Sequence, residues 1–235
     1  MPSTTSPSGV LFAIKRYALH DGPDLRVTVF LKGCPLSCLW CHNPEGIAPA
    51  PGVLTVPGKC VGCGECLAAC PQAALSPGPD GMSRNREACT ACGVCAEVCP
   101  ALAHEAVGRK WTVAEVMAEI GKETPFFAGS QGGVTFSGGE PLAQPDFLEA
   151  MLLACKELDL HRAVDTSGFA SAEPVSRVAR HTDLFLFDLK HMDPAAHRRL
   201  TGVDNALILS NLRLLAQSGA RIAPRLPLIP GMNDD

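Results

Sequence analysis

The stretch Cys34-Pro35-Leu36-Ser37-Cys38-Leu39-Trp40-Cys41 decides how the rest of this sequence is interpreted. Its three cysteines are spaced as C-x3-C-x2-C, and they directly follow the apolar run of residues 25–31. That run predicts a strand, and the glycine and proline behind it predict a turn. A loop at the end of a strand can place three thiolates around one 4Fe–4S cluster, which normally takes four. One iron would then remain open for a substrate or cofactor.

Two other interpretations of these three cysteines are a structural zinc site and a disulfide. Zinc usually takes a fourth Cys or His ligand, and His42 follows the third cysteine directly. The spacing favours a cluster over zinc, but it does not by itself decide between them.

Length and composition narrow the possible classes of protein. The 235 residues suffice for one large domain, or for one domain with a small insert, and 46% of them are hydrophobic. The net charge of −4 gives no reason to expect attraction to nucleic acid or to an anionic membrane. No apolar run approaches the length needed to cross a bilayer.

The cysteines and the first residues indicate the cellular compartment. Residues 1–9 contain no charged or apolar segment, which predicts a frayed tail and no secretion signal. The twelve cysteines stand largely at metal-ligand spacings, so we expect reduced thiolates in a cytoplasm. Because oxygen destroys exposed clusters, an anaerobic setting is expected.

An internal repeat lies between the first strand and the rest of the chain. Two runs of C-x2-C-x2-C-x3-C-P stand 29 residues apart, the spacing of bacterial ferredoxins, in which the fourth cysteine of each run binds the other cluster. The predicted ligand sets are Cys60, Cys63, Cys66 and Cys99 for one 4Fe–4S cluster, and Cys89, Cys92, Cys95 and Cys70 for the other. We therefore predict an α+β, bacterial-ferredoxin-like domain inserted at residues 50–107.

The remaining sequence alternates between strand and helix patterns. Strands are predicted at residues 10–17, 25–32, 132–137, 163–167, 184–190 and 221–229, and helices at 112–120, 145–158, 172–180, 194–200 and 205–218. Such alternation predicts a parallel sheet with right-handed crossovers. Polar residues follow five of these strands, at the end where an α/β barrel builds its site.

These patterns predict an α/β fold: a partial (β/α)6 TIM-like barrel with the ferredoxin-like insert. Residues 1–49 begin the barrel and carry the cluster loop, and residues 108–235 form its remainder. The sequence stops directly after the predicted strand at 221–229, the fifth core strand if the edge segment 10–17 is left out, so we expect the final α/β unit of the barrel to be missing.

The C-x3-C-x2-C motif is the signature of the radical S-adenosylmethionine (SAM) enzymes, which this sequence resembles. The wider segments His20-Asp21-Gly22-Pro23-Asp24-Leu25-Arg26 and Cys41-His42-Asn43-Pro44-Glu45-Gly46 resemble the activating enzymes of glycyl radical enzymes. That family usually reads Asp-Gly-Pro-Gly-Ile-Arg, so Asp24 and Leu25 depart from its pattern. Asp24 adds a side chain and a charge beside a turn where the family has glycine.

The resemblance implies a SAM site at the strand ends. Cys34, Cys38 and Cys41 would hold the SAM-binding cluster and act in catalysis with Lys190, which would neutralise the methionine carboxylate. The implied cofactor-binding residues are Trp40, Gly138, Gly139, Glu140, Asp165, Thr166, Asp188, Lys190 and Arg225, and a monovalent cation belongs to the implied cofactors. The structural alternatives are an ordinary Gly-Gly turn and a solvated Asp-Lys pair that contributes less than about 1 kcal/mol.

The resemblance also implies a reaction and partners. One electron would cleave SAM to methionine and a 5′-deoxyadenosyl radical, which would take a Cα hydrogen from a glycine of a separate enzyme. Asp21 would meet the partner's glycine-bearing peptide, although a simple turn aspartate is the alternative. The ferredoxin-type clusters would relay electrons from flavodoxin or ferredoxin to a monomeric enzyme. Two alternatives are a radical SAM enzyme for a small molecule or nucleotide, and a non-catalytic electron-transfer protein.

Overall fold

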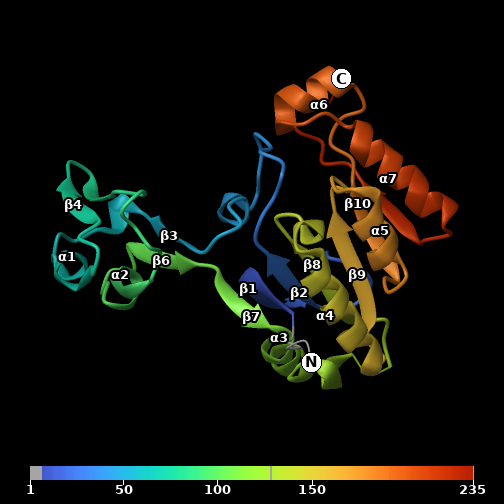
Figure 1. The fold of residues 1–235 in the computed structure, drawn as a ribbon, viewed down its shortest axis with the longest axis horizontal. Helices are drawn as coiled ribbons and strands as arrows, with labels where there is room; N and C mark the ends of the chain where they lie inside the picture. Colours follow the sequence, from blue (N-terminus) through green and yellow to red (C-terminus); the bar gives the residue numbers. More distant parts are fainter. Residues whose placement is uncertain (1–6, 128, 235) are drawn as a thin grey trace, which may run out of the picture. The chain divides into compact units, whose positions relative to one another are not determined.

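The structure is a computed structural model that describes residues 7–127 and 129–234. The chain divides into two compact units. The larger unit combines the residues up to Pro49 with those from Lys110 onward, and the smaller unit is Ala50–Arg109 (Figure 1). The sequence analysis placed an insert at residues 50–107, close to this smaller unit.

The larger unit is built on a sheet of seven strands within the described residues. In spatial order these are β11 (Ile222–Arg225), β10 (Leu184–Asp188), β9 (His161–Thr166), β8 (Gly133–Gly138), β2 (Arg26–Leu31), β1 (Ser8–Ala18) and β7 (Arg109–Thr112). Neighbouring strands pair in parallel from β2 through β8, β9 and β10 to β11, whereas β1 pairs antiparallel with β2. The predicted α/β fold with a parallel sheet is thus confirmed. Strand β7 was not predicted, because its four residues carry little apolar character.

Helices connect the parallel strands and form a layer beside them (Figure 1). They are α3 (Val113–Gly121), α4 (Pro145–Glu157), α5 (Ala172–Ala179), α6 (Pro194–Thr201) and α7 (Ala206–Gln217). Helix α4 contacts both α3 and α5, and α5 contacts α7, so these four helices form one continuous layer. The predicted start of α3 is confirmed, since Thr112 and Glu115 form a reciprocal capping box.

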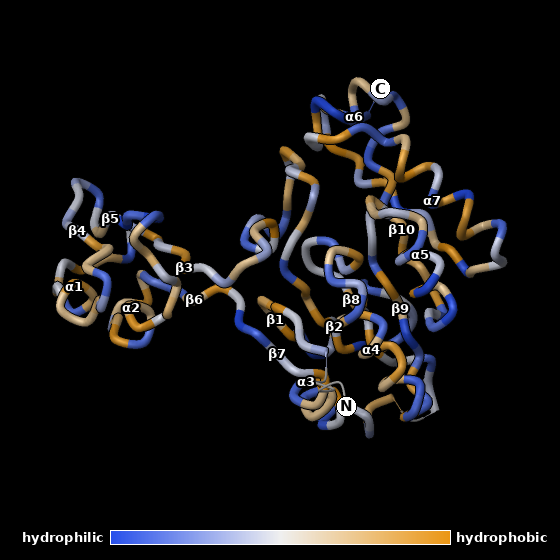
Figure 2. The backbone as a smooth tube through the Cα atoms, viewed as in Figure 1, coloured by the Kyte–Doolittle hydropathy of each residue, from blue (hydrophilic) through white to orange (hydrophobic). Residues whose placement is uncertain are grey.

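The core of the larger unit lies between the sheet and this layer of helices. All six residues of β2 are buried, as expected for a central parallel strand covered on both faces. The apolar strands run through the middle of the unit in Figure 2. Cys155, on α4, is fully buried, and burial raises the pKa of its thiol to about 12. Cys155 is therefore a buried free thiol.

The smaller unit consists of two similar halves. Its strands are β3 (Gly52–Thr55), β4 (Leu75–Gly78), β5 (Gly81–Arg84) and β6 (His104–Val107), and its helices are α1 (Glu65–Ala69) and α2 (Val94–Glu97). Strand β3 pairs antiparallel with β6, and β4 pairs antiparallel with β5. A shift of 29 residues converts β3 into β5 and β4 into β6, so the repeat extends well beyond the cysteines.

The same shift relates the backbone conformations around the cysteines. Positive φ angles occur at Gly62 (71°), Gly64 (80°) and Ala73 (46°) in the first half, and at Ala91 (55°), Gly93 (85°) and Leu102 (50°) in the second. Three of these six residues carry a side chain, which costs roughly 1–2 kcal/mol in this region of φ. The fold therefore maintains the same unfavourable turns in both halves.

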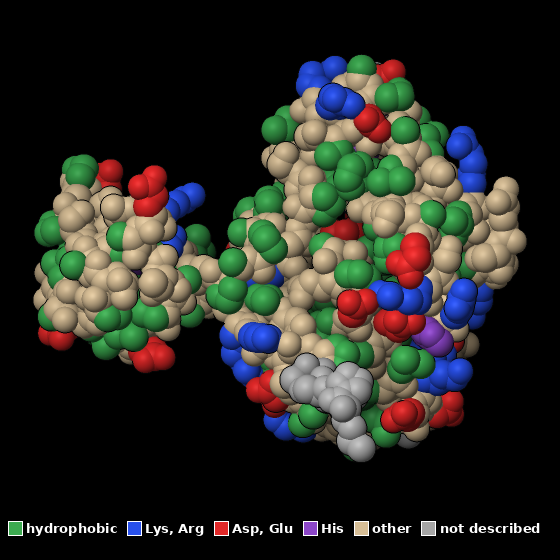
Figure 3. All heavy atoms as spheres, viewed as in Figure 1, with side chains coloured by type: hydrophobic (Ala, Val, Ile, Leu, Met, Phe, Trp, Pro, Cys, Tyr) green, Lys and Arg blue, Asp and Glu red, His purple; other side chains and the backbone are tan. Residues whose placement is uncertain are grey.

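No helix in the described residues is long and apolar enough to cross a membrane. Acidic and basic side chains are mixed over the visible face of the larger unit in Figure 3.

Candidate active site

The parallel strands end at a cleft of about 590 Å³ in the larger unit. The cysteine loop forms one wall, and the C-terminal ends of β8, β9, β10 and β11 with the residues behind them form another. Lys15, Asp21 and Phe30 complete the lining. The predicted site residues that line the cleft are Asp21, Cys34, Cys38, Trp40, Cys41, Gly138, Gly139, Asp165, Thr166, Asp188, Lys190 and Arg225. Residues far apart in sequence thus meet at one edge of the sheet, as expected for parallel strands.

Backbone hydrogen bonds hold the cysteine loop at both of its ends. Near the start, the Cys34 N–H donates to the Ile47 carbonyl over 2.9 Å. Further along, the N–H groups of Ser37 and Leu39 donate to the carbonyls of Thr201 and Leu200, over 2.8 and 3.0 Å. The last carbonyls of a helix have no hydrogen-bond partner within the helix. The two N–H groups of the loop therefore provide the donors that the C-terminal carbonyls of α6 lack.

Gly202 makes this contact possible. Its φ is +85°, and a Cβ at this position would lie 2.5 Å from Ser37 Oγ. We expect Gly202→Ala to lower the free energy of unfolding by about 1–2 kcal/mol for the backbone conformation, and further for the contact with Ser37. Urea unfolding under anaerobic conditions measures the loss.

Gly219→Ala is the matched control for this prediction. Gly219 has a φ of +77°, but nothing lies within 4 Å of the site of its Cβ. Both variants therefore carry the same conformational cost, and only Gly202→Ala disturbs the cysteine loop. Equal losses in the two variants would show that the contact with Ser37 is unimportant.

Gly138 and Gly139 are required by close packing of the backbone. A Cβ on Gly138, whose φ is +119°, would lie 2.4 Å from the backbone nitrogen and oxygen of Leu31. A Cβ on Gly139 would lie 2.5 Å from the Gly33 oxygen. These glycines let the end of β8 pack directly against the segment that enters the cysteine loop, and they also line the cleft.

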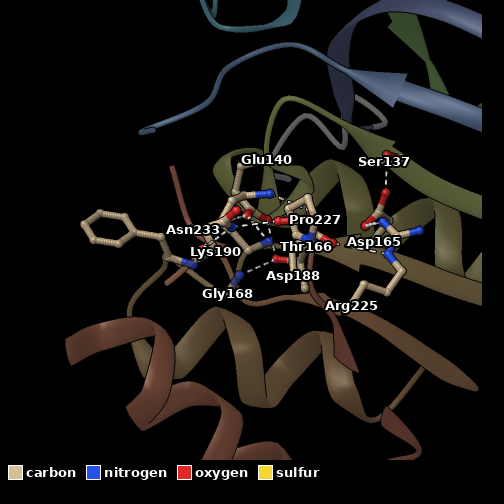
Figure 4. A network of polar contacts seen from close by, with 12 residues as sticks. Ser137, Glu140, Asp165, Thr166, Gly168, Asp188, Lys190, Arg225, Pro227 and Asn233 are labelled. Atoms are coloured by element: carbon tan, nitrogen blue, oxygen red, sulfur yellow. Dashed lines mark hydrogen bonds and ion pairs between the residues drawn. The ribbon is translucent and has the colours of Figure 1, made fainter. Parts of the chain in front are cut away.

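Four charged residues from three strand ends form one network in the cleft (Figure 4). Asp188 accepts hydrogen bonds from Lys190 Nζ over 2.7 Å and from Arg225 Nε over 3.2 Å. Arg225 also forms an ion pair with Asp165, which in turn accepts a 2.7 Å hydrogen bond from Ser137 Oγ. These pairs are largely shielded from water, unlike the solvated pair considered as the structural alternative.

The electrostatics of this network keep its cations charged. Burial by itself would lower the pKa of Lys190, but the neighbouring Asp188 carboxylate outweighs it and raises that pKa. The pKa of Arg225 rises as well, because Asp165 and Asp188 outweigh its burial. Burial, followed by repulsion from Asp188, raises the pKa of Asp165. The network thus places two cations beside two carboxylates in the cleft, a suitable environment for a ligand with both charges.

Glu140 does not line the cleft, although the sequence analysis placed it among the cofactor-binding residues. Its carboxylate is 1% exposed and accepts hydrogen bonds from Thr166 Oγ1, Ser167 N, Ser167 Oγ and Leu142 N, at 2.6, 2.9, 2.6 and 3.1 Å. Burial raises the pKa of this carboxyl, and the four donors oppose that rise. Glu140 therefore fixes the end of β9, where Thr166 lines the cleft, and the start of the loop that follows it.

Asp21 lies on a loop that a buried arginine supports. Arg26 is fully buried and donates to the Pro23 carbonyl, to Thr135 Oγ1 and to the Val134 carbonyl, over 3.1, 2.6 and 2.6 Å. Burial lowers the pKa of Arg26 to about 10. The Asp21 carboxylate accepts a 2.6 Å hydrogen bond from Thr28 Oγ1. Asp21 is thus held in place at the cleft and does not belong to a loose turn.

The cysteines of the cleft are free thiols here, and all twelve cysteines of the chain lie in the described residues without a disulfide. Burial raises the pKa of Cys34 to about 11 and also raises that of Cys38. Such thiols must lose their protons when they bind iron. Among the described residues, no three His, Cys, Asp or Glu side chains group closely enough to hold a single metal ion.

Sequence reasoning missed several residues that shape the cleft. Ser137 and Ser167 line it and donate hydrogen bonds to Asp165 and to the buried Glu140. Asn233 Nδ2 donates to the carbonyls of Lys190 and Pro227, over 3.0 and 2.7 Å. The two serines stand next to recognised motifs, so their positions gave a signal. Nothing in the sequence near Asn233 points to its contact with a strand end 43 residues away.

The eight cysteines of the smaller unit line two cavities. One is lined by Cys60, Cys63, Cys66 and Cys99, and the other by Cys70, Cys89, Cys92 and Cys95. Each cavity thus combines three cysteines of one run with the fourth cysteine of the other run. Backbone N–H groups point at the sulfurs in matching ways, from Ala74 to Cys70 over 3.3 Å and from Ala103 to Cys99 over 3.2 Å.

A comparison with family models matches residues 28–235 to the radical SAM superfamily. The chain belongs to this superfamily, and within it to the activating enzymes of glycyl radical enzymes. Membership implies a 4Fe–4S cluster and SAM.

Curated relatives support the assignment to the activating enzymes of glycyl radical enzymes. The trans-4-hydroxy-L-proline dehydratase activating enzyme of Clostridioides difficile is 45% identical over 223 residues, which cover 94% of this chain and 74% of the relative. The choline trimethylamine-lyase activating enzyme of Oleidesulfovibrio alaskensis is 43% identical over 229 residues, which cover 96% and 74%.

Among solved structures, a domain of a pyruvate-formate lyase-activating enzyme from Bacteroides vulgatus is 47% identical to this chain. The match covers 44% of this chain and 65% of that domain, with a TM-score of 0.42.

Proposed function

We propose that this chain is a radical SAM activase that cleaves SAM reductively and takes a Cα hydrogen from one glycine of a partner enzyme. The observation that carries this proposal is the cleft, in which three cysteines face a network of two cations and two carboxylates. The named relatives support the same activity. No observation favours a small-molecule substrate or a purely electron-transferring role.

The donor set of the cleft suits a cluster with one open iron. Cys34, Cys38 and Cys41 would provide the three thiolates, since all three line the same cleft. When bound, the cluster supplies the electron that breaks the sulfur–C5′ bond of SAM, which leaves methionine and the radical that takes hydrogen from glycine. The chain itself binds and orients SAM and excludes water from the site.

The methionine end of SAM carries an amino group and a carboxylate, which match the charges at the strand ends. Lys190 and Arg225 would attract the carboxylate, while Asp165 and Asp188 keep these cations in place and attract the amino group. The backbone at Gly138 and Gly139 would give the ligand close access to the edge of β8. Trp40 and Thr166 would complete the cleft, and a monovalent cation beside the carboxylates is part of this proposal.

Asp188→Asn tests the role of the network in SAM binding. The change removes the negative charge that faces both Lys190 and Arg225. It also removes one negative charge from the surroundings of SAM, whose own net charge is positive. We expect the KM for SAM to rise by about tenfold, with a smaller change in kcat, because the loss concerns binding. Steady-state formation of 5′-deoxyadenosine measures both constants.

Asp204→Asn is the control for that variant. Asp204 forms an equally short ion pair with Arg198, over 2.6 Å, but this pair is exposed and lies outside the cleft. Its loss should leave the KM for SAM unchanged. An unchanged KM in Asp188→Asn as well would contradict the proposed role of the network.

The smaller unit would serve electron delivery as a bacterial-ferredoxin-like domain. Its two cavities fit two 4Fe–4S clusters, with Cys60, Cys63, Cys66 and Cys99 around one, and Cys70, Cys89, Cys92 and Cys95 around the other. N–H groups directed at the sulfurs are the donors that such clusters need. Flavodoxin or ferredoxin would provide the electrons to a monomeric enzyme in an anaerobic cytoplasm.

The decisive experiment combines the reconstituted chain, SAM and a reductant with candidate partners under anaerobic conditions. The candidates are the enzyme types in the relatives' names: a trans-4-hydroxy-L-proline dehydratase, a choline trimethylamine-lyase and an isethionate sulfite-lyase. We expect 5′-deoxyadenosine, and a glycyl radical signal in electron paramagnetic resonance (EPR) with the correct partner. A partner whose radical-bearing glycine is replaced by alanine should give no signal. The proposal fails if the reduced, fully loaded chain forms no 5′-deoxyadenosine.

A further inference from the structure

The two halves of the smaller unit differ in polar side chains at two pairs of equivalent positions beside the cysteine cavities. The 29-residue shift converts Thr55 into Arg84 and Leu75 into His104. Thr55 lies opposite His104 in the β3–β6 pair, and Arg84 lies opposite Leu75 in the β4–β5 pair. The pseudo-symmetric halves thus present different polar groups at equivalent positions.

Arg84 lies against the cavity of Cys70, Cys89, Cys92 and Cys95. Its Nη1 donates to the sulfur of Cys89 over 3.6 Å, and its buried Nε has no hydrogen-bond partner in the described part of the chain. Arg84 thus places a permanent positive charge beside a predicted iron ligand. The equivalent residue of the other half is Thr55, which is neutral.

His104 lies against the cavity of Cys60, Cys63, Cys66 and Cys99. The side chain is 2% exposed, and its Nδ1 is 3.1 Å from Thr55 Oγ1. If the hydroxyl donates to Nδ1, the proton of the neutral ring stands on Nε2, which is buried and has no partner among the described residues. The equivalent residue at the other cavity, Leu75, offers no donor.

Each reduction adds a negative charge to a cluster that already carries the charge of four thiolates. A positive charge or an N–H donor beside the sulfurs stabilises the reduced form and raises the reduction potential. A charged donor is roughly twice as strong as a neutral one. The two cavities therefore differ in how strongly they stabilise an added electron.

We propose that Arg84 and His104 give the two clusters different reduction potentials, with the higher potential at the cluster of Cys70, Cys89, Cys92 and Cys95. This inference rests on the proposed presence of two ferredoxin-type clusters. It assigns each cluster a tuning residue, neither of which is an iron ligand.

The test is an EPR-monitored redox titration of the full, reconstituted chain and of variants that exchange residues between the halves. We expect the two ferredoxin-type clusters of the wild type to be reduced in two separate steps, counted apart from the step of the cluster in the cleft. Arg84→Thr introduces the residue of the other half and should lower the higher potential, with about a tenfold change in the equilibrium, or about 59 mV for one electron. His104→Leu should lower the other potential by less. Each variant should leave the opposite cluster nearly unchanged.

Conservative variants separate tuning from damage to the fold. Arg84→Lys keeps the charge and His104→Gln keeps an N–H donor, so both should retain much of the wild-type potentials. Arg86→Gln removes the charge of an exposed arginine that lines neither cavity, and should shift neither potential.

The possible outcomes distinguish a failure of this inference from a failure of the proposed ferredoxin-type clusters. One shared reduction potential for the two ferredoxin-type clusters of the wild type would overturn the inference while leaving the clusters in place. Equal shifts of the reduction potential in Arg84→Thr and Arg86→Gln would do the same. Iron and sulfide contents that account for only one cluster would overturn the proposed ferredoxin-type clusters themselves.

Discussion

Replacing Cys41 by alanine is expected to abolish the reductive cleavage of SAM and to remove about four of about twelve iron atoms from the loaded chain. Cys41 lines the cleft together with Cys34 and Cys38, so its loss leaves two thiolates for a cluster that already lacks a fourth. Two thiolates hold a cubane poorly, and the iron would be lost or would bind without an ordered open position. Iron and sulfide analysis, together with 5′-deoxyadenosine formation, measures both effects.

Cysteine variants elsewhere provide the controls for this result. Cys155→Ala removes a buried thiol that lines none of the proposed cluster sites, and should keep all of the iron and the activity. Cys89→Ala should also remove about four irons, but those of the smaller unit, and SAM should still bind. Full iron content and SAM cleavage in Cys41→Ala would contradict the three-cysteine site. A zinc content of one atom per chain in the wild type, lost on this substitution, would also contradict it.

Glu140→Gln is expected to lower the free energy of unfolding by about 2–4 kcal/mol. Four donors converge on two carboxylate oxygens, two donors to each oxygen. Glutamine replaces one of these oxygens with an NH2 group, which cannot accept a hydrogen bond. One backbone N–H then faces another donor in a site without access to water, and the hydroxyl bound to the same oxygen must turn to accept from the NH2 group. A buried donor without an acceptor is costly.

Urea unfolding of the anaerobic protein measures this loss, and the SAM site should show it as well. Because Thr166 and Ser167 lose an anchor, the KM for SAM should rise although Glu140 does not touch the cleft. Glu157→Gln, at the exposed end of α4, makes the same chemical change without buried partners and should have no effect. If both variants unfold at the same urea concentration, the hydrogen-bonded carboxylate has little structural importance.

The sequence predicted the parts of the structure that depend on local patterns. The apolar run before Cys34 and the repeated strand and helix patterns are local, and the structure contains the elements that they predict. The side chains after β9, β10 and β11 converge because parallel strands end at one edge of a sheet. That rule needs no knowledge of the particular contacts.

The remaining features depend on contacts between distant residues. Ser37 meets the end of α6 across 164 residues of sequence, and no local pattern reveals this contact. The motif around Glu140 indicated its importance but not the direction of its carboxylate, which depends on the loop after β9. The difference between Arg84 and His104 could have been read from the repeat, but its position beside the sulfurs required the structure.

The hydrogen bonds between the cysteine loop and the end of α6 join two regions that lie 164 residues apart in the sequence. Local opening of one must break the hydrogen bonds of the other, so they should exchange their amide protons for deuterium as one cooperative unit. Damage to the iron site by oxygen would then loosen a whole helix near the C-terminal end of the chain. The fold would thereby turn a chemical injury at a few atoms into an unfolding event that cellular proteases can recognise.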